Sequence, residues 1–244
     1  SPFVLGVSAG ASLGVAIAFL TVTRLIVNTA HRFAFPFLPA ITRGLGISLE
    51  QGGVLMSARS VAFIATPAVV ASAGRGERRL RLALWGLAMM AVGALVTAAT
   101  GVFFGAVMGF ILLGLGKPTF DAAAQAHIAD RTPYERRARY MSILELTWSG
   151  GLLIGAPVAG WLIDRFGWEA PFWAVGIAFA VMMAISPLVL EPDRPHEHHE
   201  RARLHLDRPR IALLSVAALF SFSAETTFIV FGAWLEDAFA LSIA

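Results

Sequence analysis

The chain has 244 residues, of which 57% are hydrophobic and 14% are charged, whereas roughly 25% of the residues in a soluble globular domain are charged. Its mean hydropathy is +0.71 and its net charge is +3, so an ordinary soluble domain is excluded. The absence of cysteine excludes disulfides, thiolate metal sites and cysteine nucleophiles. Long apolar runs recur, and each is long enough to cross a bilayer as a helix. We predict an all-α, polytopic membrane helix bundle.

About seven transmembrane helices are predicted from these apolar runs. The first covers residues 14–39 and ends at Pro36 and Pro39, and a short loop at 42–51 follows. The next five are predicted at 52–72, 82–97, 100–120, 141–162 and 171–190. The composition then becomes polar over 191–210, and a seventh span is predicted at 211–235.

The distribution of arginines predicts the orientation of these spans. The loops after the second, fourth and sixth spans contain thirteen arginines, whereas the loops after the first, third and fifth contain only Arg43 and Arg165. Basic loops remain on the cytoplasmic side of a membrane. We therefore place the N-terminus inside, and we expect a bacterial cytoplasmic membrane.

The most informative motifs lie between residues 114 and 168. A basic loop at 130–139 leads into a span in which Gly151 and Gly155 are four residues apart, and Pro157 and Gly160 follow. Glycines at this spacing share one helix face and allow a neighbouring backbone to approach closely. The combination resembles the fourth and fifth spans of the major facilitator superfamily of secondary transporters. The segment 155–160 is similar to that family's fifth-span antiporter motif, which favours efflux.

The turn after the second span also resembles this family, with two departures nearby. It keeps the basic pair Arg78 and Arg79, for which the resemblance implies a gating role, but Gly74 stands where the family has an aspartate. Phe110 occupies the apparent place of the family's fourth-span arginine. This second departure weakens the inference of proton antiport by the family's standard route.

The resemblance implies a partial major facilitator fold. A six-helix N-terminal bundle is expected at 15–190, a cytoplasmic His/Arg-rich central linker at 191–210, and the first helix of a C-terminal bundle at 211–244. Alternating access needs two bundles that move about a site between them. We therefore predict an incomplete chain that does not transport its solute alone.

Residues 1–14 closely resemble a segment of iron-siderophore and vitamin B12 type ABC permeases, but the match does not continue. We treat them as an apolar N-terminal extension of uncertain origin. The alternative function is therefore an ABC-type iron-siderophore permease subunit, or a chimeric fragment without transport activity. A seven-span photoreceptor is disfavoured because Lys117, the only lysine, lies in the fourth span and not in the last.

Charged and polar side chains at membrane depth mark a pathway or an ion pair. Six candidates for a solute cavity lie on the first, second and seventh spans: Arg24, Asn28, His31, Arg32, Arg59 and Glu225. Arg24, Asn28 and His31 form one polar stripe on the first span. In one hypothesis His31, Arg32, Arg59 and Glu225 face a shared cavity in which Glu225 is the counter-ion or proton carrier. In the other they form a structural set of salt bridges. The excess of positive charge favours an anionic or zwitterionic solute, with protons as a candidate coupling ion.

Two further pairs lie on the fourth and fifth spans. Glu145 and Trp148 are three residues apart and share a helix face; we expect Glu145 to be a hydrated gate residue that pairs with a loop arginine. Lys117 and Asp121 are four residues apart at the inner end of the fourth span, and we expect them to pair with each other.

Neither a metal site nor a cofactor is expected, and we predict no catalytic residues. The histidines His196, His198 and His199 lie in a proline-bounded polar stretch without the spacing typical of metal ligands. The sequence has no His-Glu-x-x-His motif and no serine, histidine and acid at matching depths. An enzyme is therefore disfavoured, and the expected partners are the lipid bilayer and a small solute rather than nucleic acid.

Overall fold

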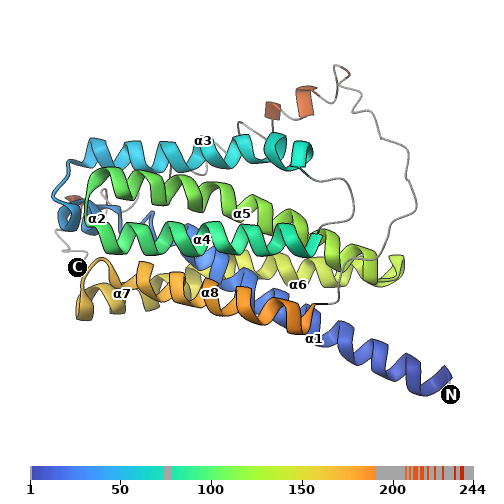
Figure 1. Cartoon of the computed structure of the whole chain (residues 1–244). Helices are drawn as coiled ribbons and strands as arrows, with labels where there is room; N and C mark the ends of the chain where they lie inside the picture. The colour runs from blue at the N-terminus through green and yellow to red at the C-terminus, as the bar shows by residue number, and fades with distance from the viewer. Residues whose placement is uncertain are drawn as a thin grey trace.

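The computed structural model is all-helical over its described residues (Figure 1), as predicted. It describes residues 2–73 and 79–190 and isolated positions between 207 and 238, while the side chains of residues 2–12 and 67–73 fall outside the description. The helices are α1 (Pro2–Arg32), α2 (Leu38–Leu45), α3 (Leu49–Ala73), α4 (Arg79–Thr100), α5 (Phe103–Arg131), α6 (Tyr134–Leu153), α7 (Gly155–Phe166) and α8 (Ala170–Val189).

Five segments of the described chain are long and apolar enough to cross a membrane. They are Leu13–Arg32, Arg79–Thr100, Phe103–Arg131, Tyr134–Phe166 and Ala170–Val189. They agree with five of the predicted spans, and α3 covers the second predicted span. The seventh, at 211–235, lies largely outside the described residues.

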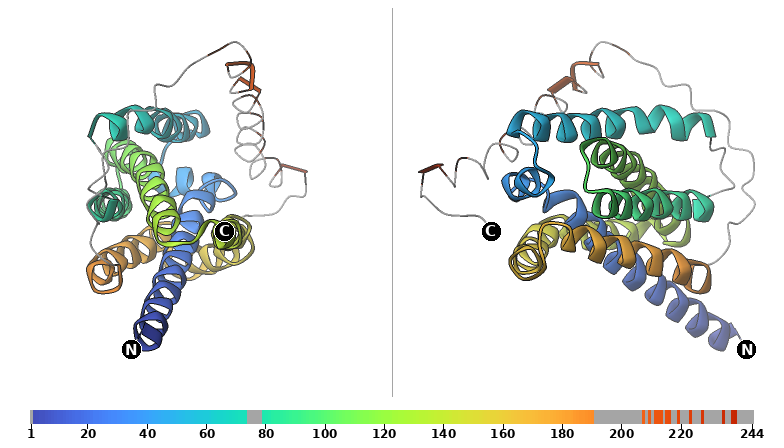
Figure 2. Two further views of the ribbon diagram at one scale, coloured as in Figure 1. Left: turned by 90° about the vertical axis from the view of Figure 1, so that its right-hand side faces the viewer. Right: turned by 60° about the vertical axis from the view of Figure 1, so that its left-hand side comes forward.

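The long helices form one bundle around α1 and α5 (Figures 1 and 2). Helix α5 packs against α3 and α4, helix α8 packs against α4 and α1, and α6 packs against α1. The N-terminal end of α1 extends past the other helices in each view (Figure 2). The rest of α1 lies inside the bundle and contacts α5, α6, α7 and α8.

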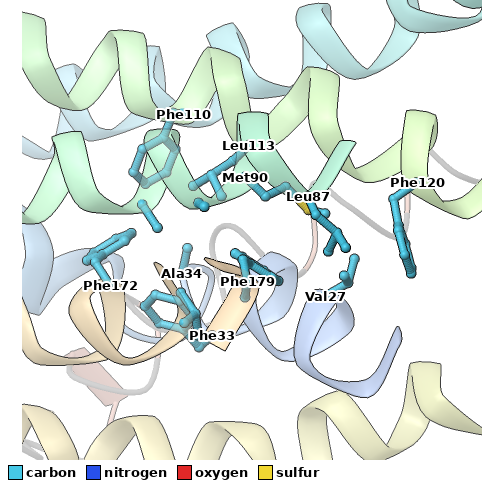
Figure 3. Close-up of a cluster of buried hydrophobic side chains, with 14 of the residues drawn as sticks. Val27, Phe33, Ala34, Leu87, Met90, Phe110, Leu113, Phe120, Phe172 and Phe179 are labelled. Atoms are coloured by element: carbon cyan, nitrogen blue, oxygen red, sulfur yellow. The ribbon is translucent and has the colours of Figure 1, made fainter. Parts of the chain in front are cut away.

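Phenylalanine and aliphatic side chains together fill the apolar core between these helices (Figure 3). The ring centroids of Phe33 and Phe172 are 5.0 Å apart, and those of Phe110 and Phe172 are 6.0 Å apart. All three rings are fully buried or nearly so. Phe110 therefore contributes to packing between α5, α8 and the turn that follows α1.

Glycines bring the backbones of α4 and α5 into direct contact. A Cβ atom on Gly86 would lie 2.7 Å from the amide nitrogen of Phe120 and 2.8 Å from the carbonyl oxygen of Gly116. One on Gly93 would lie 2.6 Å from the carbonyl oxygen of Gly109. Such distances leave no space for a side chain, as in other close helix contacts of membrane proteins. We call the four glycines Gly86, Gly93, Gly109 and Gly116 the glycine interface.

The predicted end of the first span and the loop after it are wrong. Helix α1 ends at Arg32, and a separate helix, α2, covers the end of the predicted span and the start of the predicted loop before Gly46 ends it with a positive φ of 64°. Pro39 lies in the first turn of α2, where its missing N–H costs nothing and its fixed φ suits a helix start. This proline therefore begins a helix, whereas the prediction had it ending one.

The predicted fifth span is a broken helix, α6 followed by α7 with Ile154 between them. Pro157 has no backbone N–H to donate to the carbonyl of Leu153, and its ring clashes with that carbonyl. This explains why α6 ends at Leu153. The basic loop predicted at 130–139 is also mostly helical, because α5 continues to Arg131 and α6 begins at Tyr134.

Candidate functional site

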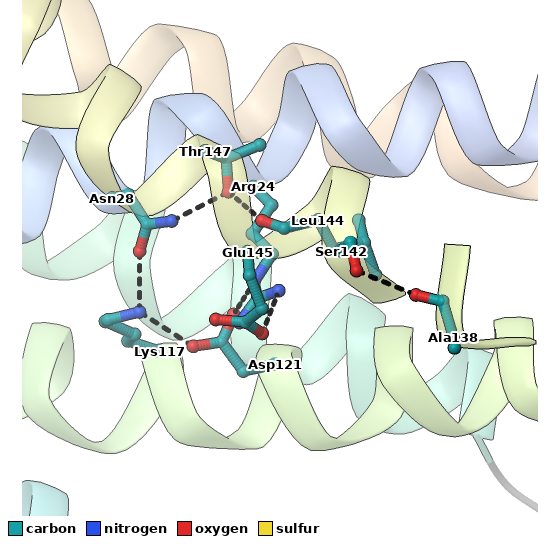
Figure 4. A network of polar contacts seen from close by, with 9 residues as sticks. All are labelled: Arg24, Asn28, Lys117, Asp121, Ala138, Ser142, Leu144, Glu145 and Thr147. Atoms are coloured by element: carbon teal, nitrogen blue, oxygen red, sulfur yellow. Dashed lines mark hydrogen bonds and ion pairs between the residues drawn. The ribbon is translucent and has the colours of Figure 1, made fainter. Parts of the chain in front are cut away.

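A polar network crosses the bundle where α1, α5 and α6 meet (Figure 4). At its centre is Arg24 of α1, whose side chain is 6% exposed. Its Nε lies 3.2 Å from Oδ1 of Asp121 on α5, and its Nη1 lies 2.9 Å from Oε1 of Glu145 on α6. One guanidinium group therefore connects carboxylates from two other helices.

The network continues from Asp121 through Lys117 on the same helix and returns to α1 and α6. The Nζ of Lys117 donates to Oδ2 of Asp121 at 2.7 Å and to Oδ1 of Asn28 at 2.9 Å. The side-chain amide of Asn28 donates to the hydroxyl of Thr147 at 2.9 Å. We call these six residues the polar junction: Arg24, Asn28, Lys117, Asp121, Glu145 and Thr147.

Close backbone contact between α1 and the α6–α7 segment places the polar junction. A Cβ on Gly151 would lie 2.8 Å from the carbonyl carbon of Asn28, and one on Gly155 would collide with the side chain of Thr29. Because Thr147 is one turn before Gly151, this contact brings its hydroxyl to Asn28. The prediction that Gly151 and Gly155 are helix-contact residues is confirmed.

A second arginine of α1 stacks on α6 two turns further along. The guanidinium carbon of Arg32 lies 3.4 Å from the centroid of the Trp148 ring. Arg32 is 6% exposed, whereas Trp148 is 45% exposed. The negative face of an indole ring attracts a guanidinium placed over it. Arg32 therefore has a cation–π partner on α6, and Arg24 has an ion-pair partner on the same helix.

Arg59 of α3 lies elsewhere and holds the end of α1. Its Nη1 donates to the carbonyl oxygen of His31 at 2.8 Å, and its guanidinium carbon lies 4.6 Å from the Phe35 ring centroid. The His31 ring contacts Phe35 and Phe63, with centroids 5.8 Å and 6.0 Å away. Carbonyls in the last turn of a helix lack intrahelical partners, so Arg59 satisfies one of them.

The expected basic gating residue Arg79 contacts the end of α5. It forms a salt bridge with Asp130, and its Nη1 donates to the carbonyl oxygen of Ala126 at 2.9 Å. The start of α4 is thereby joined to the C-terminal turns of α5. Arg78 and Glu225 lie outside the described residues, as do the three clustered histidines His196, His198 and His199.

The family model of the Major Facilitator Superfamily matches residues 18–244. The chain belongs to the Major Facilitator Superfamily. This result supports the resemblance and shows a transporter family rather than an enzyme. It also leaves residues 1–14, where the ABC permease resemblance lies, outside the match.

Individual facilitators are similar to the chain over part of their length. The uncharacterized MFS-type transporter YwfA of Bacillus subtilis is 28% identical over 145 residues, which are 57% of this chain and 34% of that protein. The chloramphenicol resistance protein of Streptomyces lividans is 30% identical over 172 residues, which are 68% of this chain and 44% of that protein. The chain thus spans less than half of either relative.

A solved facilitator structure has the same fold. It is a bacterial homologue of the human lysosomal transporter Spinster, in an inward-facing and unoccupied conformation. The TM-score is 0.71 at 16% sequence identity, and the alignment covers 96% of this chain and 57% of that one. The predicted partial major facilitator fold is confirmed.

The structure regroups the residues that the sequence singled out. Lys117 and Asp121 do pair, as predicted, but near the middle of α5, because that helix continues to Arg131. Glu145 pairs with Arg24 of α1, so the expectation of a loop arginine as its partner is wrong. Thr147 was not recognised, although its position two residues after Glu145 on a glycine-rich helix was a weak signal.

Proposed function

We propose that this chain provides the N-terminal six-helix bundle of a secondary transporter, which moves a small solute by alternating access. The observation that carries the proposal is the polar junction, because four charged side chains meet between three helices that are long and apolar enough to cross a membrane. Charges in such positions are costly and are typical of substrate or ion pathways. The two-bundle mechanism of such transporters places the solute between bundles.

The solute that we expect is anionic or zwitterionic, and protons are the candidate coupling ion. Asp121 and Glu145 are carboxylates within a charged network, which is the composition of proton relays in transporters. The positive-inside distribution of arginines supports a cytoplasmic N-terminus in a bacterial inner membrane. Export is the direction that the fifth-span motif at 155–160 favours.

An ABC permease subunit is the less supported alternative. The residues that resemble such permeases are 1–14, whereas the facilitator model covers 18–244. We propose that 1–14 are an extension that takes no part in the solute site. Since one bundle supports no alternating access, we expect transport only from a protein that also contains a second bundle.

Reconstitution tests the transport proposal. The product of the complete source reading frame is placed in proteoliposomes, and uptake of radiolabelled organic acids and amino acids is measured under an imposed pH gradient. We expect accumulation of at least one solute, and at least a tenfold loss with Arg24→Lys, because a lysine ammonium lacks the planar fork of donors with which a guanidinium holds a carboxylate in two-point contact. Arg165→Lys, at an exposed position, is the matched control. Absence of gradient-driven accumulation across the panel would contradict the proposal.

A further inference from the structure

We propose that Arg24 binds the carboxylate of the solute, and that Glu145 occupies the place of that carboxylate when no solute is present. The inference rests on the proposed function and names the solute class for the same site. It assigns Glu145 an exchangeable role: the incoming carboxylate takes the Nη1 of Arg24, and Glu145 turns away. The argument depends on how differently the two acids that contact Arg24 are held.

Asp121 is the fixed partner of Arg24. Its side chain is 17% exposed, and its two oxygens are both engaged, Oδ1 by the Nε of Arg24 and Oδ2 by the Nζ of Lys117. Both cations are themselves buried. Removing a carboxylate from two buried cations would leave them uncompensated, which is strongly unfavourable.

Glu145 is the replaceable partner. Its side chain is 60% exposed, and within the described part of the chain it makes one ion pair, to the Nη1 of Arg24 at 2.9 Å. Ion pairs with such exposure contribute little, because water competes with both partners. A solute carboxylate can therefore take this position at small cost, and bidentate geometry at a guanidinium would favour it.

The competing hypothesis is that Glu145 and Trp148 bind a cationic solute. Glu145 and Trp148, an acid and an indole one turn apart, are both partly exposed, and such a pair suits a cation. Both groups, however, already contact guanidiniums, those of Arg24 and Arg32. A cation would have to separate buried arginines from their partners, whereas an anion displaces only an exposed glutamate.

The most deeply buried charged side chains of the described residues are all positive. Among the described residues, the buried charged side chains are Arg24, Arg32, Arg59 and Lys117, and no acid reaches the same degree of burial. In the polar junction, Asp121 and Glu145 balance Arg24 and Lys117, so an anion that replaces Glu145 on Arg24 keeps the contacts of that guanidinium balanced, whereas a cation would add to its charge.

The position of Trp148 indicates which group is attached to the carboxylate of the solute. It lies three residues from Glu145 on the same face of α6, about 4.5 Å along the helix axis, and it is 45% exposed. A carboxylate held at Arg24 would place an attached ring or alkyl chain near this indole. Aromatic carboxylates are the class that fits both groups.

Ligand-observed ¹⁹F NMR tests this assignment on the purified product of the complete source reading frame, with 4-fluorobenzoate as the probe. Its neutral and cationic counterparts are 4-fluorobenzamide and 4-fluorobenzylamine. We expect Glu145→Gln to bind 4-fluorobenzoate at least tenfold more tightly than the parent protein, because the competing carboxylate is gone. Binding of the amide and the amine should not tighten.

Two controls make the result specific. Glu135→Gln removes an exposed acid from the first turn of the same helix and should leave the benzoate affinity unchanged. Trp148→Leu should weaken benzoate binding at least threefold in the Glu145→Gln background. Because binding requires no solute movement, a protein that behaves in this way but moves no solute would contradict only the transport proposal.

Three results would overturn the assignment. The first is unchanged or weaker binding of 4-fluorobenzoate to the Glu145→Gln protein, since a structural glutamate would give that result. The second is no detectable binding of the benzoate to this variant. The third is binding of 4-fluorobenzylamine to the parent protein that disappears in Glu145→Gln, which would show a cation site.

Discussion

The glycine interface and the polar junction both include residues of α5, but they are built in opposite ways. At the glycine interface, Gly86 and Gly93 bring the backbone of α4 against α5 with no side chain between them. At the polar junction, side chains of Arg24 and Lys117 span the distance to Asp121. Backbone contacts have one arrangement, whereas a guanidinium between two carboxylates can exchange one of them. We infer that the first contact is permanent and that the second is where the bundle responds to solute.

Asp121→Asn should have the largest effect on stability. It removes the acid shared by two buried cations, and breaking a buried pair typically costs about 3–5 kcal/mol. The measurement is thermal unfolding of the detergent-purified protein, followed by helical circular dichroism. Asp164→Asn, at an exposed position on α7, should change little. Recovery of part of the loss in Asp121→Asn/Lys117→Met would confirm the uncompensated charge as its cause, and no recovery would count against it.

Gly86→Val should follow, with a loss of about 3 kcal/mol, at the upper end of overpacking effects. Its Cβ would press on the amide nitrogen of Phe120 and the carbonyl oxygen of Gly116, and neither can move without moving α5. Gly53→Val is the matched control, because a Cβ there meets no atom within 4 Å. Equal melting temperatures for the two variants would show that α4 and α5 do not need this close contact.

Arg59→Met should have an intermediate effect. It removes the charged donor to the carbonyl oxygen of His31 and keeps much of the apolar volume beside Phe35. A hydrogen bond to a charged group contributes about 1.5–3 kcal/mol, so we expect a loss of about 2 kcal/mol in the same unfolding assay. Arg165→Met, on the exposed surface of α7, should be nearly neutral. If Arg59→Met left the stability unchanged, the end of α1 at Arg32 would not depend on the hydrogen bond from Arg59.

Glu145→Gln should have the smallest effect, below about 1 kcal/mol, because its carboxylate is 60% exposed and exposed pairs contribute little. The contrast with Asp121→Asn is the informative quantity, since both variants remove one acid from the same arginine. A Glu145 variant as unstable as the Asp121 variant would show that both carboxylates are fixed, and the exchange of one for a solute would no longer be supported.

Hydropathy and helical spacing predicted the membrane class, most of the helices, the pairing of Lys117 with Asp121 and the contact role of Gly151. These features depend on one segment at a time. The pairing of Arg24 with Glu145 depends on how α1 and α6 are aligned, and that alignment results from backbone contact between Gly151 and Asn28. A pattern along one helix contains no information about its register against another helix. The sequence therefore predicts the pair on α5, Lys117 with Asp121, but not the contacts of the polar junction between helices.

The proline signals failed for a related reason. A proline marks a helix boundary, but the sequence does not say on which side the helix lies. Pro39 begins α2, and Pro157 follows the break at Ile154 inside a predicted continuous span. Both outcomes follow from the missing N–H and the fixed φ of proline, and the packing of neighbouring helices decides between them.

The most direct test of the central claim is a crystal structure of the complete protein with 4-bromobenzoate, in which anomalous scattering locates the bromine. We predict a bromine peak between α1 and α6 near Trp148, with the carboxylate on Arg24 and the Glu145 side chain turned away. A peak in another part of the bundle, with the ion pair between Arg24 and Glu145 intact, would contradict the polar junction as the solute site.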